Sequence, residues 1–146
     1  MRINVTVPNW SPALSYTPQL LWSEGNETDA SLSNFIQDLY KFGYHSTTLN
    51  GPSMVFNFNG TGVWIFGGFR PSLGPYNVKL DNSTFSNPGF GAGDSESFQA
   101  VLFGKDDMDC APHQLILYNN AAPNNSQAVL DVDYVRDSAC NIWVSF

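Results

Sequence analysis

The chain has 146 residues, which is enough for one domain with a hydrophobic core. Hydrophobic residues make up 42%, charged residues only 13%, and the formal net charge is −7. This acidic balance argues against binding to nucleic acids and to anionic membranes, because both require clustered Lys and Arg. No apolar run reaches the roughly 18 residues of a membrane-spanning helix, so we expect no membrane insertion by this segment.

The N-terminal third mixes strand and helix signals. Residues 3–7 alternate as a first strand, and residues 10–22 are interrupted by prolines, with a short extended piece at 14–16. Residues 25–29 form a polar loop. The next apolar residues recur at helical spacing, with Ser31 as a candidate N-cap and Gly43 after the last turn. This pattern predicts one short helix over 31–42, followed by a strand over 44–49.

The stretch from residue 54 to residue 81 organises the chain. Residues 54–58 alternate as a strand, and 59–62 (Asn-Gly-Thr-Gly) have the composition of a turn. Residues 63–66 are apolar on both faces, which predicts a strand covered on both sides, with Trp64 in the core. A connection rich in Gly and Pro then leads to an alternating strand over 76–80.

The remainder continues the β pattern. Residues 83–96 are predicted as a loop, and strands are expected over 98–103, 113–118, 129–135 and 142–144. Short strands separated by turn residues indicate an all-β sandwich that forms a single domain over 1–146. Met1 leads straight into a strand and the chain stops just after an apolar segment, so we expect a domain excised from a larger secreted or membrane-anchored protein.

The order FNFNGTGVWIFG followed by RPSLGPYNVKLD resembles a β-sandwich domain of secreted and cell-surface proteins of basidiomycete fungi. It is also similar to the galactose-binding-like jelly rolls, many of which are carbohydrate-binding modules. Further matching pieces are Tyr16-Thr17-Pro18 with Trp22, residues 44–48 and residues 130–134. The resemblance covers most of the chain and implies a jelly-roll fold, whereas one fold hosts many functions.

Several features indicate an extracellular location. Six Asn-x-Ser/Thr sequons are present, more than the composition predicts by chance, and they suggest a secreted glycoprotein. Asn9 is the poorest acceptor because Pro12 follows its sequon, which leaves Asn4, Asn26, Asn59, Asn82 and Asn124.

The two cysteines predict a Cys110–Cys140 disulfide in an oxidising compartment. The bridge would either close a hairpin or join opposite sheets of the sandwich.

Catalytic signals are weak. The sequence has two histidines, His45 and His113, and neither a nucleophile elbow nor a metalloprotease motif. Asp38, His45 and Ser46 could form a triad only if adjacent residues of one strand pointed the same way, which a strand does not allow. His113, which opens a strand, is expected to be structural. We therefore expect a protein that is not an enzyme.

Residues in or beside loops are the candidate ligand contacts. Aromatic rings stack on the C–H faces of sugars, and Trp22 or Tyr44 would supply such a platform. His45 and Arg70 would donate to hydroxyl groups or to an acidic sugar, and Phe69 lies beside Arg70. The alternative role of Arg70 is a structural clamp on carbonyl groups or on an acidic turn.

No cofactor is expected, with one exception. Carbohydrate-binding modules that this chain resembles often hold a structural calcium through an Asp of the last strand, where Asp133 lies here. Their other ligands come from the N-terminal region, where this chain has Asn9 and no nearby carboxylate, so the resemblance is incomplete at that point. The alternative is a solvated acidic face.

These observations lead to one preferred function and two alternatives. The preferred function is non-catalytic binding of a glycan or cell-wall polysaccharide by a secreted or surface protein of a fungus. The first alternative is a structural or adhesive glycoprotein ectodomain that binds a protein or presents its own glycans. The second is an accessory domain of a hydrolase. The sequence predicts neither the sugar nor the oligomeric state.

Overall fold

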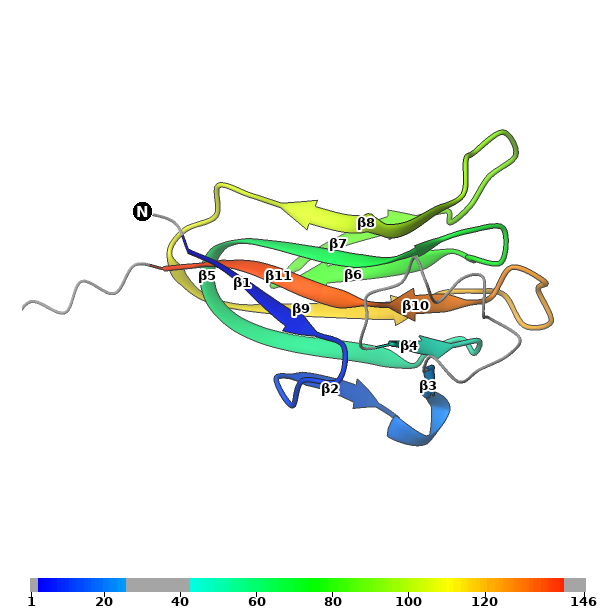
Figure 1. Cartoon of the computed structure of the whole chain (residues 1–146), viewed down its shortest axis with the longest axis horizontal. Helices are drawn as coiled ribbons and strands as arrows, with labels where there is room; N and C mark the ends of the chain where they lie inside the picture. Colours follow the sequence, from blue (N-terminus) through cyan, green and yellow to red (C-terminus); the bar gives the residue numbers. More distant parts are fainter. Residues whose placement is uncertain (1–2, 26–42, 141–146) are drawn as a thin grey trace, which may run out of the picture.

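The computed structural model describes residues 3–25 and 43–140, and it consists almost entirely of antiparallel strands (Figure 1). The predicted helix over 31–42 and the predicted strand over 142–144 lie outside these residues. No helix among the described residues is long and apolar enough to cross a membrane. The elements are β1 (Ile3–Pro8), β2 (Leu14–Thr17), the 3-10 helix η1 (Gln19–Leu21), β3 (Ser23–Gly25), β4 (Tyr44–Thr47), β5 (Ser53–Phe69), β6 (Tyr76–Leu80), β7 (Ser83–Asn87), β8 (Ser97–Lys105), β9 (Ala111–Asn119), β10 (Leu130–Val132) and β11 (Tyr134–Ala139).

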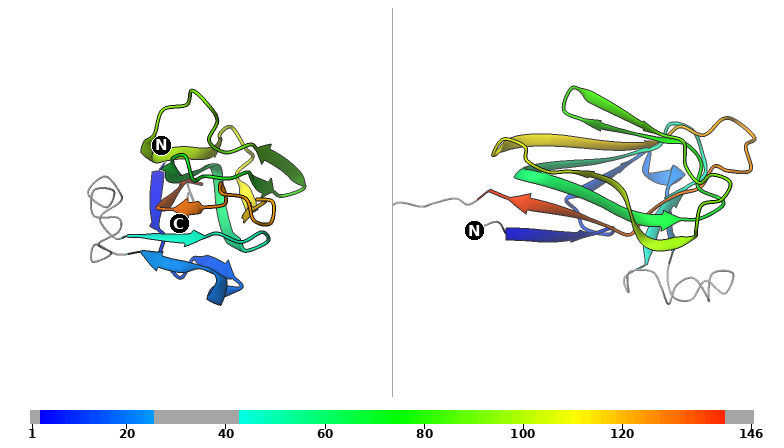
Figure 2. Two further views of the ribbon diagram at one scale, coloured as in Figure 1. Left: turned by 90° about the vertical axis from the view of Figure 1, so that its right-hand side faces the viewer. Right: turned by 90° about the horizontal axis from the view of Figure 1, so that it is seen from above.

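Strand β5 belongs to both layers of the molecule. Its first half pairs with β2 and β9, and β9 pairs in turn with β6 and then β7. Its second half pairs with β8 and β11, and β11 pairs with β1. A small sheet of β10, β4 and β3 completes the fold. Figure 2 shows β1 and β11 on one side of the molecule and β9 on the other. The predicted all-β jelly-roll sandwich is confirmed.

The predicted turn over 59–62 is instead a bend within one hydrogen-bonded strand. Gly60 is opposite Ala111 of β9 on one side and Ala139 of β11 on the other, so the chain passes from one layer to the other at this residue. A Cβ atom at Gly60 would lie 2.4 Å from the carbonyl oxygen of Ser138. The glycine predicted for a turn is therefore needed because two backbones approach closely.

Alternate residues of the strands form the core, as period-2 patterning requires. On β5, Met54, Phe56 and Phe58 point inward from one layer, and Val63 and Ile65 from the other. Facing or flanking strands add buried residues of the same kind: Val7, Leu14, Val78, Leu80, Leu102, Leu115, Leu117 and Val135. The core thus lies between the two layers.

Trp64 is not part of this core, and its predicted burial is wrong. It lies between the inward Val63 and Ile65, so alternation turns its ring outward. There the ring lies over Gly104, whose Cβ atom, if added, would lie 2.5 Å from Trp64 Cδ1.

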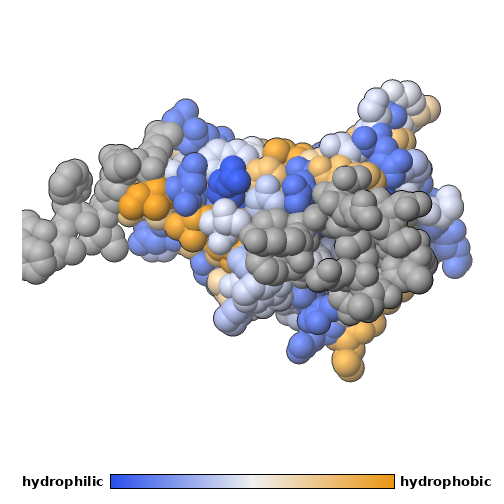
Figure 3. Space-filling view, in the orientation of Figure 1, coloured by the Kyte–Doolittle hydropathy of each residue, from blue (hydrophilic) through white to orange (hydrophobic). Residues whose placement is uncertain are grey.

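Figure 3 shows the side of the molecule on which β1 and β11 lie, where hydrophilic and hydrophobic groups are mixed.

Two further aromatic rings lie next to Trp64 on the same outer face and pack on each other. Phe66 stacks on Tyr134 of β11 with 4.4 Å between ring centroids, and the guanidinium of Arg136 lies 5.3 Å from the Phe66 centroid. The apolar composition of 63–66 therefore reflects one buried face and one outer face whose rings pack on each other.

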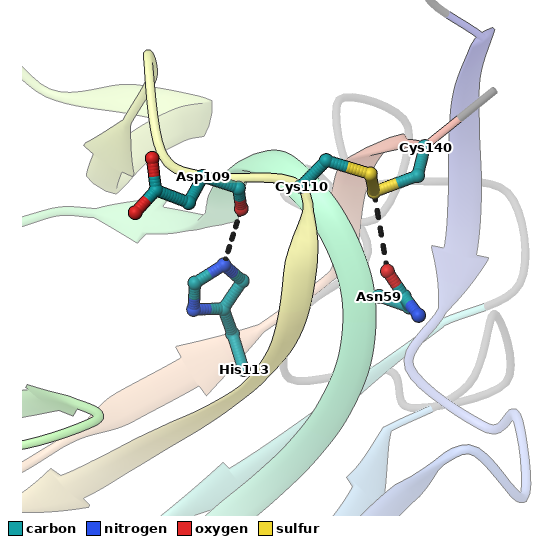
Figure 4. The surroundings of a disulfide bond; sticks show 5 residues. All are labelled: Asn59, Asp109, Cys110, His113 and Cys140. Carbon is teal, nitrogen blue, oxygen red and sulfur yellow. Dashed lines mark hydrogen bonds between the residues drawn. A yellow bond between two sulfur atoms is a disulfide. The ribbon is translucent and has the colours of Figure 1, made fainter.

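The predicted Cys110–Cys140 disulfide is present (Figure 4). Cys110 precedes β9 and Cys140 follows β11, and these strands lie in different layers on the two sides of Gly60. The bridge therefore joins opposite layers, which is the second of the two predicted arrangements. Its sequence separation of 30 corresponds to roughly 3 kcal/mol in the chain-entropy model.

Two other strand predictions need correction. Residues 83–96 are predicted as a loop, but β7 occupies their first part as an edge strand whose side chains are mostly exposed and, apart from Phe85, polar. Its single neighbour is β6, so packing imposes no apolar alternation that the sequence could display. Residues 129–135 form two strands separated by Asp133, because β10 pairs with β4 and β11 with β5.

Candidate functional site

An open cavity of about 650 Å³ lies between β2, η1, β3 and β4. Eight residues line it: Leu14, Ser15, Tyr16, Gln19, Leu20, Trp22, Glu24 and His45. Two of them, Trp22 and His45, are predicted ligand contacts. The cavity combines aromatic rings with a carboxylate and an imidazole, so its chemistry differs from that of the purely apolar core.

Three rings form a contiguous group at this cavity. The ring of Tyr16 stacks on the imidazole of His45, with 4.0 Å between centroids and an interplanar angle of 7°. Trp22 meets Tyr16 edge to face, with centroids 4.9 Å apart. Trp22 is only 7% exposed and belongs to the core cluster. It therefore supports Tyr16 and the cavity floor and does not present an open face.

Pairing of β3 with β4 places a carboxylate next to the imidazole. Glu24 and His45 are direct cross-strand partners. Glu24 Oε1 lies 3.2 Å from His45 Nε2, and the Glu24 side chain is 76% exposed whereas that of His45 is 9% exposed. Cross-strand neighbours on one face are within reach of each other, so this contact follows from the strand register.

Asn9 fixes the other side of the imidazole. Its amide nitrogen donates to the carbonyl oxygens of Gly43 and Asp133, each at 2.9 Å. Its amide oxygen is then free to accept, and it lies 2.7 Å from His45 Nδ1. The Tyr16 hydroxyl donates to the Asn9 carbonyl oxygen at 2.7 Å. Asn9 is 2% exposed, so this network is buried.

The network also determines where the proton of His45 lies. Because Asn9 Oδ1 can only accept, His45 Nδ1 carries the hydrogen and Nε2 of the neutral ring is an acceptor. Burial lowers the pKa of His45, and this effect outweighs the nearby Glu24 carboxylate, which raises it. Burial, with a contribution from Glu24, raises the pKa of the Tyr16 hydroxyl, which therefore stays protonated.

Tyr44 does not line the cavity. It is 5% exposed, and its ring lies against the backbone of Gly25, where an added Cβ atom would be 2.0 Å from Tyr44 Cζ. Tyr44 and Trp22 are thus both buried, and the expectation that they present open stacking faces is wrong. The physical reason is that pairing of β3 with β4 places the Tyr44 ring over Gly25, while Trp22 packs in the core cluster. The sequence places these two residues in or beside loops and gives no sign of this packing.

Arg70 and Phe69 are also away from the cavity. Arg70 Nη2 donates to Asp131 Oδ2 at 2.5 Å, and the Asp131 side chain is 1% exposed. Burial raises the pKa of Asp131, and the Arg70 charge opposes this shift. Arg70 therefore holds a buried carboxylate of β10, the clamp role foreseen as the alternative. Phe69 packs against Phe90, with centroids 5.1 Å apart.

Sequence reasoning missed Glu24, Asn9 and Gln19 as members of this site. Asn9 is named in the sequence argument as a poor glycosylation acceptor and as the residue in the region where related modules supply calcium ligands, and Glu24 carries no motif. Glu24 reaches His45 because β3 pairs with β4, and a single sequence gives no local sign of this pairing. Tyr16 enters the sequence argument as part of the short extended piece at 14–16 and through the resemblance.

The donors around Asp133 do not by themselves fit a calcium site. Asp133 is fully buried, and its carbonyl oxygen accepts from the backbone N–H of Asn9 as well as from the Asn9 amide. Calcium takes six to eight oxygen ligands, whereas Asn9 turns its nitrogen toward Asp133 and its oxygen toward His45. Within residues 3–25 and 43–140, no group of three or more His, Cys, Asp or Glu side chains could hold a metal. Calcium at Asp133 stays a prediction.

A second hollow, of about 660 Å³, lies between the β4–β5 loop and the β9–β10 loop. Its lining includes exposed Leu49 and the sequon residue Asn124, and the described residues around it include no aromatic ring and no charged side chain. A glycan attached at Asn124 would compete for this space. The first cavity is therefore the stronger candidate site.

Comparison with known proteins supports the fold. No protein-family model matches the sequence, and no curated protein sequence matches it. Among solved structures, the chain is similar to a family two carbohydrate esterase from Cellvibrio japonicus (TM-score 0.62, 10% identity, 96% of this chain and 35% of that chain). It is equally similar to a two-domain esterase active on acetylated mannans (TM-score 0.62, 9% identity, 95% and 37%).

A third similar structure is a complete small domain, the CBM36-1 domain of a multidomain xylanase from the hindgut metagenome of Trinervitermes trinervoides. Its TM-score is 0.51 at 13% identity, with 96% of this chain and 100% of that chain covered. The chain spans about a third of the length of the two esterases. At these identities the likeness concerns the fold alone, which is that of a β-sandwich similar to carbohydrate-binding modules.

Proposed function

We propose that this chain is a non-catalytic carbohydrate-binding domain of a secreted or cell-surface protein, and that the cavity beside Tyr16 and His45 is its glycan site. The observation that carries the proposal is the cavity itself, which joins a stacked aromatic pair to exposed polar groups. Sugars are bound in this way by other proteins, because rings contact their C–H faces while polar groups bond their hydroxyls. The similar structures support the same class of function.

The rim of the cavity adds both kinds of contact. Leu20, in η1, is 97% exposed and offers an apolar edge. Gln19 and Ser15, both exposed, supply an amide and a hydroxyl. None of the described sequon residues Asn4, Asn59, Asn82 and Asn124 lines this cavity, so glycans attached there would leave it open.

The composition of the cavity favours binding over hydrolysis. Glycoside hydrolysis generally uses two carboxylates that flank the scissile bond, and among the described residues that line the cavity Glu24 is the one carboxylate. His45 is oriented by an amide oxygen of Asn9 and stacked on Tyr16, which holds it in place as a binding group. The ligand class that we propose is a cell-wall glycan of a fungus, and the location is extracellular, in keeping with the disulfide.

The experiment is a binding screen of the purified domain against fungal and plant polysaccharides, followed by calorimetry. We expect weak affinity, with Kd between micromolar and millimolar, or about 4–8 kcal/mol. Ser15→Trp should fill the cavity and abolish binding, because Ser15 is exposed and lines it. Ser83→Trp, on the exposed edge strand β7, is the matched control and should bind as the wild type does. No binding of the wild type to any glycan would overturn the proposal.

A structural or adhesive ectodomain is the second candidate. It is favoured by the outer face of β5, β8 and β11, where Trp64 and the Phe66–Tyr134 pair lie outside the core and Val101 of β8, opposite Phe66, is 58% exposed. Loss of partner adhesion in Val101→Ser, with glycan binding absent, would support this candidate over the first.

A further inference from the structure

The cavity presents acceptors where a ligand would bind. With Nδ1–H committed to Asn9, the Nε2 lone pair of neutral His45 points to the side of Glu24, whose Oε1 is 3.2 Å away. A neutral imidazole nitrogen and an ionised carboxylate oxygen both lack a hydrogen. The two groups therefore cannot bond each other while His45 is neutral, and each is available to a donor from outside.

The charges around this pair are of one sign. The groups that face His45 are Glu24 from β3, Tyr16 from β2 and the neutral amide of Asn9. Arg70, Lys79, Lys105 and Arg136, the basic side chains of the described part of the chain, do not line the cavity. Among the residues that the structure describes, an acidic sugar would find no counter-ion at this cavity. The formal net charge of −7 adds a field that attracts cations and repels anions.

We infer, on the basis of the proposed glycan site, that the Glu24–His45 pair selects glycans with free amino groups, of the glucosamine type, over N-acetylated and acidic ones. An ammonium group carries three N–H donors and a positive charge, so it can donate to Glu24 and to His45 Nε2 together. A single hydroxyl has one hydrogen and can satisfy only one of the two acceptors. An N-acetyl group has one N–H and no charge.

This inference reverses one expectation from the sequence. His45 and Arg70 were expected to donate to hydroxyls or to an acidic sugar. Arg70 instead pairs with Asp131, and the outward nitrogen of His45 is an acceptor.

The test compares short oligosaccharides of equal length by calorimetry in weakly acidic buffer, in which the amino groups of the sugar are protonated, at about 0.15 M salt, where long-range charge effects are screened. The probes are a tetramer of glucosamine, a tetramer of N-acetylglucosamine and a tetramer of galacturonic acid. We expect the wild type to bind the glucosamine tetramer about ten times more tightly than the acetylated one, and to show no binding of the acidic one. Glu24→Gln, an isosteric change at an exposed residue, should reduce that preference to about twofold or less.

Glu96→Gln is the matched control, because it removes the same charge from an exposed residue that is not in the cavity. It should retain the preference of the wild type. Equal loss in both variants would assign the preference to overall charge and overturn the inference. Glycan binding without preference for amino groups would also overturn it while leaving the proposed function intact. Absence of binding to every glycan would overturn both.

Discussion

A single buried amide connects segments from the two ends of the chain. Asn9 bonds Gly43, Asp133 and His45 through its side chain, and its backbone N–H donates to Asp133. A buried polar group that loses its partners costs about 1–3 kcal/mol. The residue that orients the imidazole of the cavity is thus also a structural one, which couples the geometry of the site to the stability of the fold.

The first prediction follows from these bonds. Asn9→Ala should lower the free energy of unfolding by about 2–4 kcal/mol, because the Gly43 carbonyl and His45 Nδ1 lose the Asn9 side chain as a partner and the Asp133 carbonyl keeps only the backbone N–H. Chemical denaturation followed by fluorescence would measure the change. Asn82→Ala, at an exposed turn residue, is the control and should remain within about 0.5 kcal/mol of the wild type. Equal effects in the two variants would show that the Asn9 network contributes nothing.

A second residue-scale prediction concerns pH. Burial alone would lower the pKa of His113, but hydrogen bonds to the Asp109 carbonyl and the Asp81 carboxylate outweigh it, so the pKa is raised. The Asp109 bond is drawn in Figure 4. A backbone hydrogen bond from Gln114, followed by the bond with His113, lowers the pKa of Asp81. Both groups are therefore charged between the depressed pKa of Asp81 and the raised pKa of His113.

The sign for His113 follows from linkage. A pKa that is raised in the folded state adds stability that is fully present below the unfolded value, about 6.5, and lost as pH rises through the folded value. His113→Gln should therefore destabilise the protein more at pH 5.5 than at pH 9, as measured by thermal unfolding at both values. A larger loss at pH 9 would contradict the assigned pair.

At the scale of elements, β5 shows how far sequence patterns determine the fold. Period-2 alternation correctly predicts the strand in the first half of β5, and the apolar run over 63–66 correctly predicts a strand in its second half. The sequence does not distinguish a turn at 59–62 from a bend in a continuous strand, since glycine suits both: a turn uses its conformational freedom, and the bend uses the close backbone approach that Gly60 allows. Nor does it show which face of 63–66 is inside when both faces are apolar.

The position of Trp64 outside the core can be tested directly. Trp64→Ala should cost about 1–2 kcal/mol, because the ring packs on the outer face and leaves no enclosed cavity. Ile65→Ala, one residue further on β5 and 0% exposed, should cost about 2–5 kcal/mol. Urea denaturation of both variants would measure the contrast. A Trp64 variant as unstable as the Ile65 variant would return Trp64 to the core.

At the scale of the whole molecule, the candidate site was predictable only in part. Residue type indicated Trp22 and His45, and the structure brings both to one cavity with Tyr16. It could not indicate Glu24, which reaches His45 only through the pairing of β3 with β4. Residue type also overestimated the exposure of Trp22 and Tyr44, because an aromatic ring beside a loop and one packed against a neighbouring strand have the same local sequence. Residue chemistry is local, whereas burial and partners depend on long-range pairing.

The pattern of glycosylation is the last prediction, and it concerns the whole surface. Asn4, Asn59, Asn82 and Asn124 are exposed, whereas Asn9 is 2% exposed and has its amide nitrogen bonded to two carbonyls. An attached glycan would replace an amide hydrogen of Asn9 and could not fit beside Gly43 and Asp133. Protein secreted from a eukaryotic host should carry glycans at exposed sequons and none at Asn9. Mass spectrometry of peptides before and after enzymatic deglycosylation would measure this occupancy. Folded protein with a glycan at Asn9 would contradict the buried network on which the site is built.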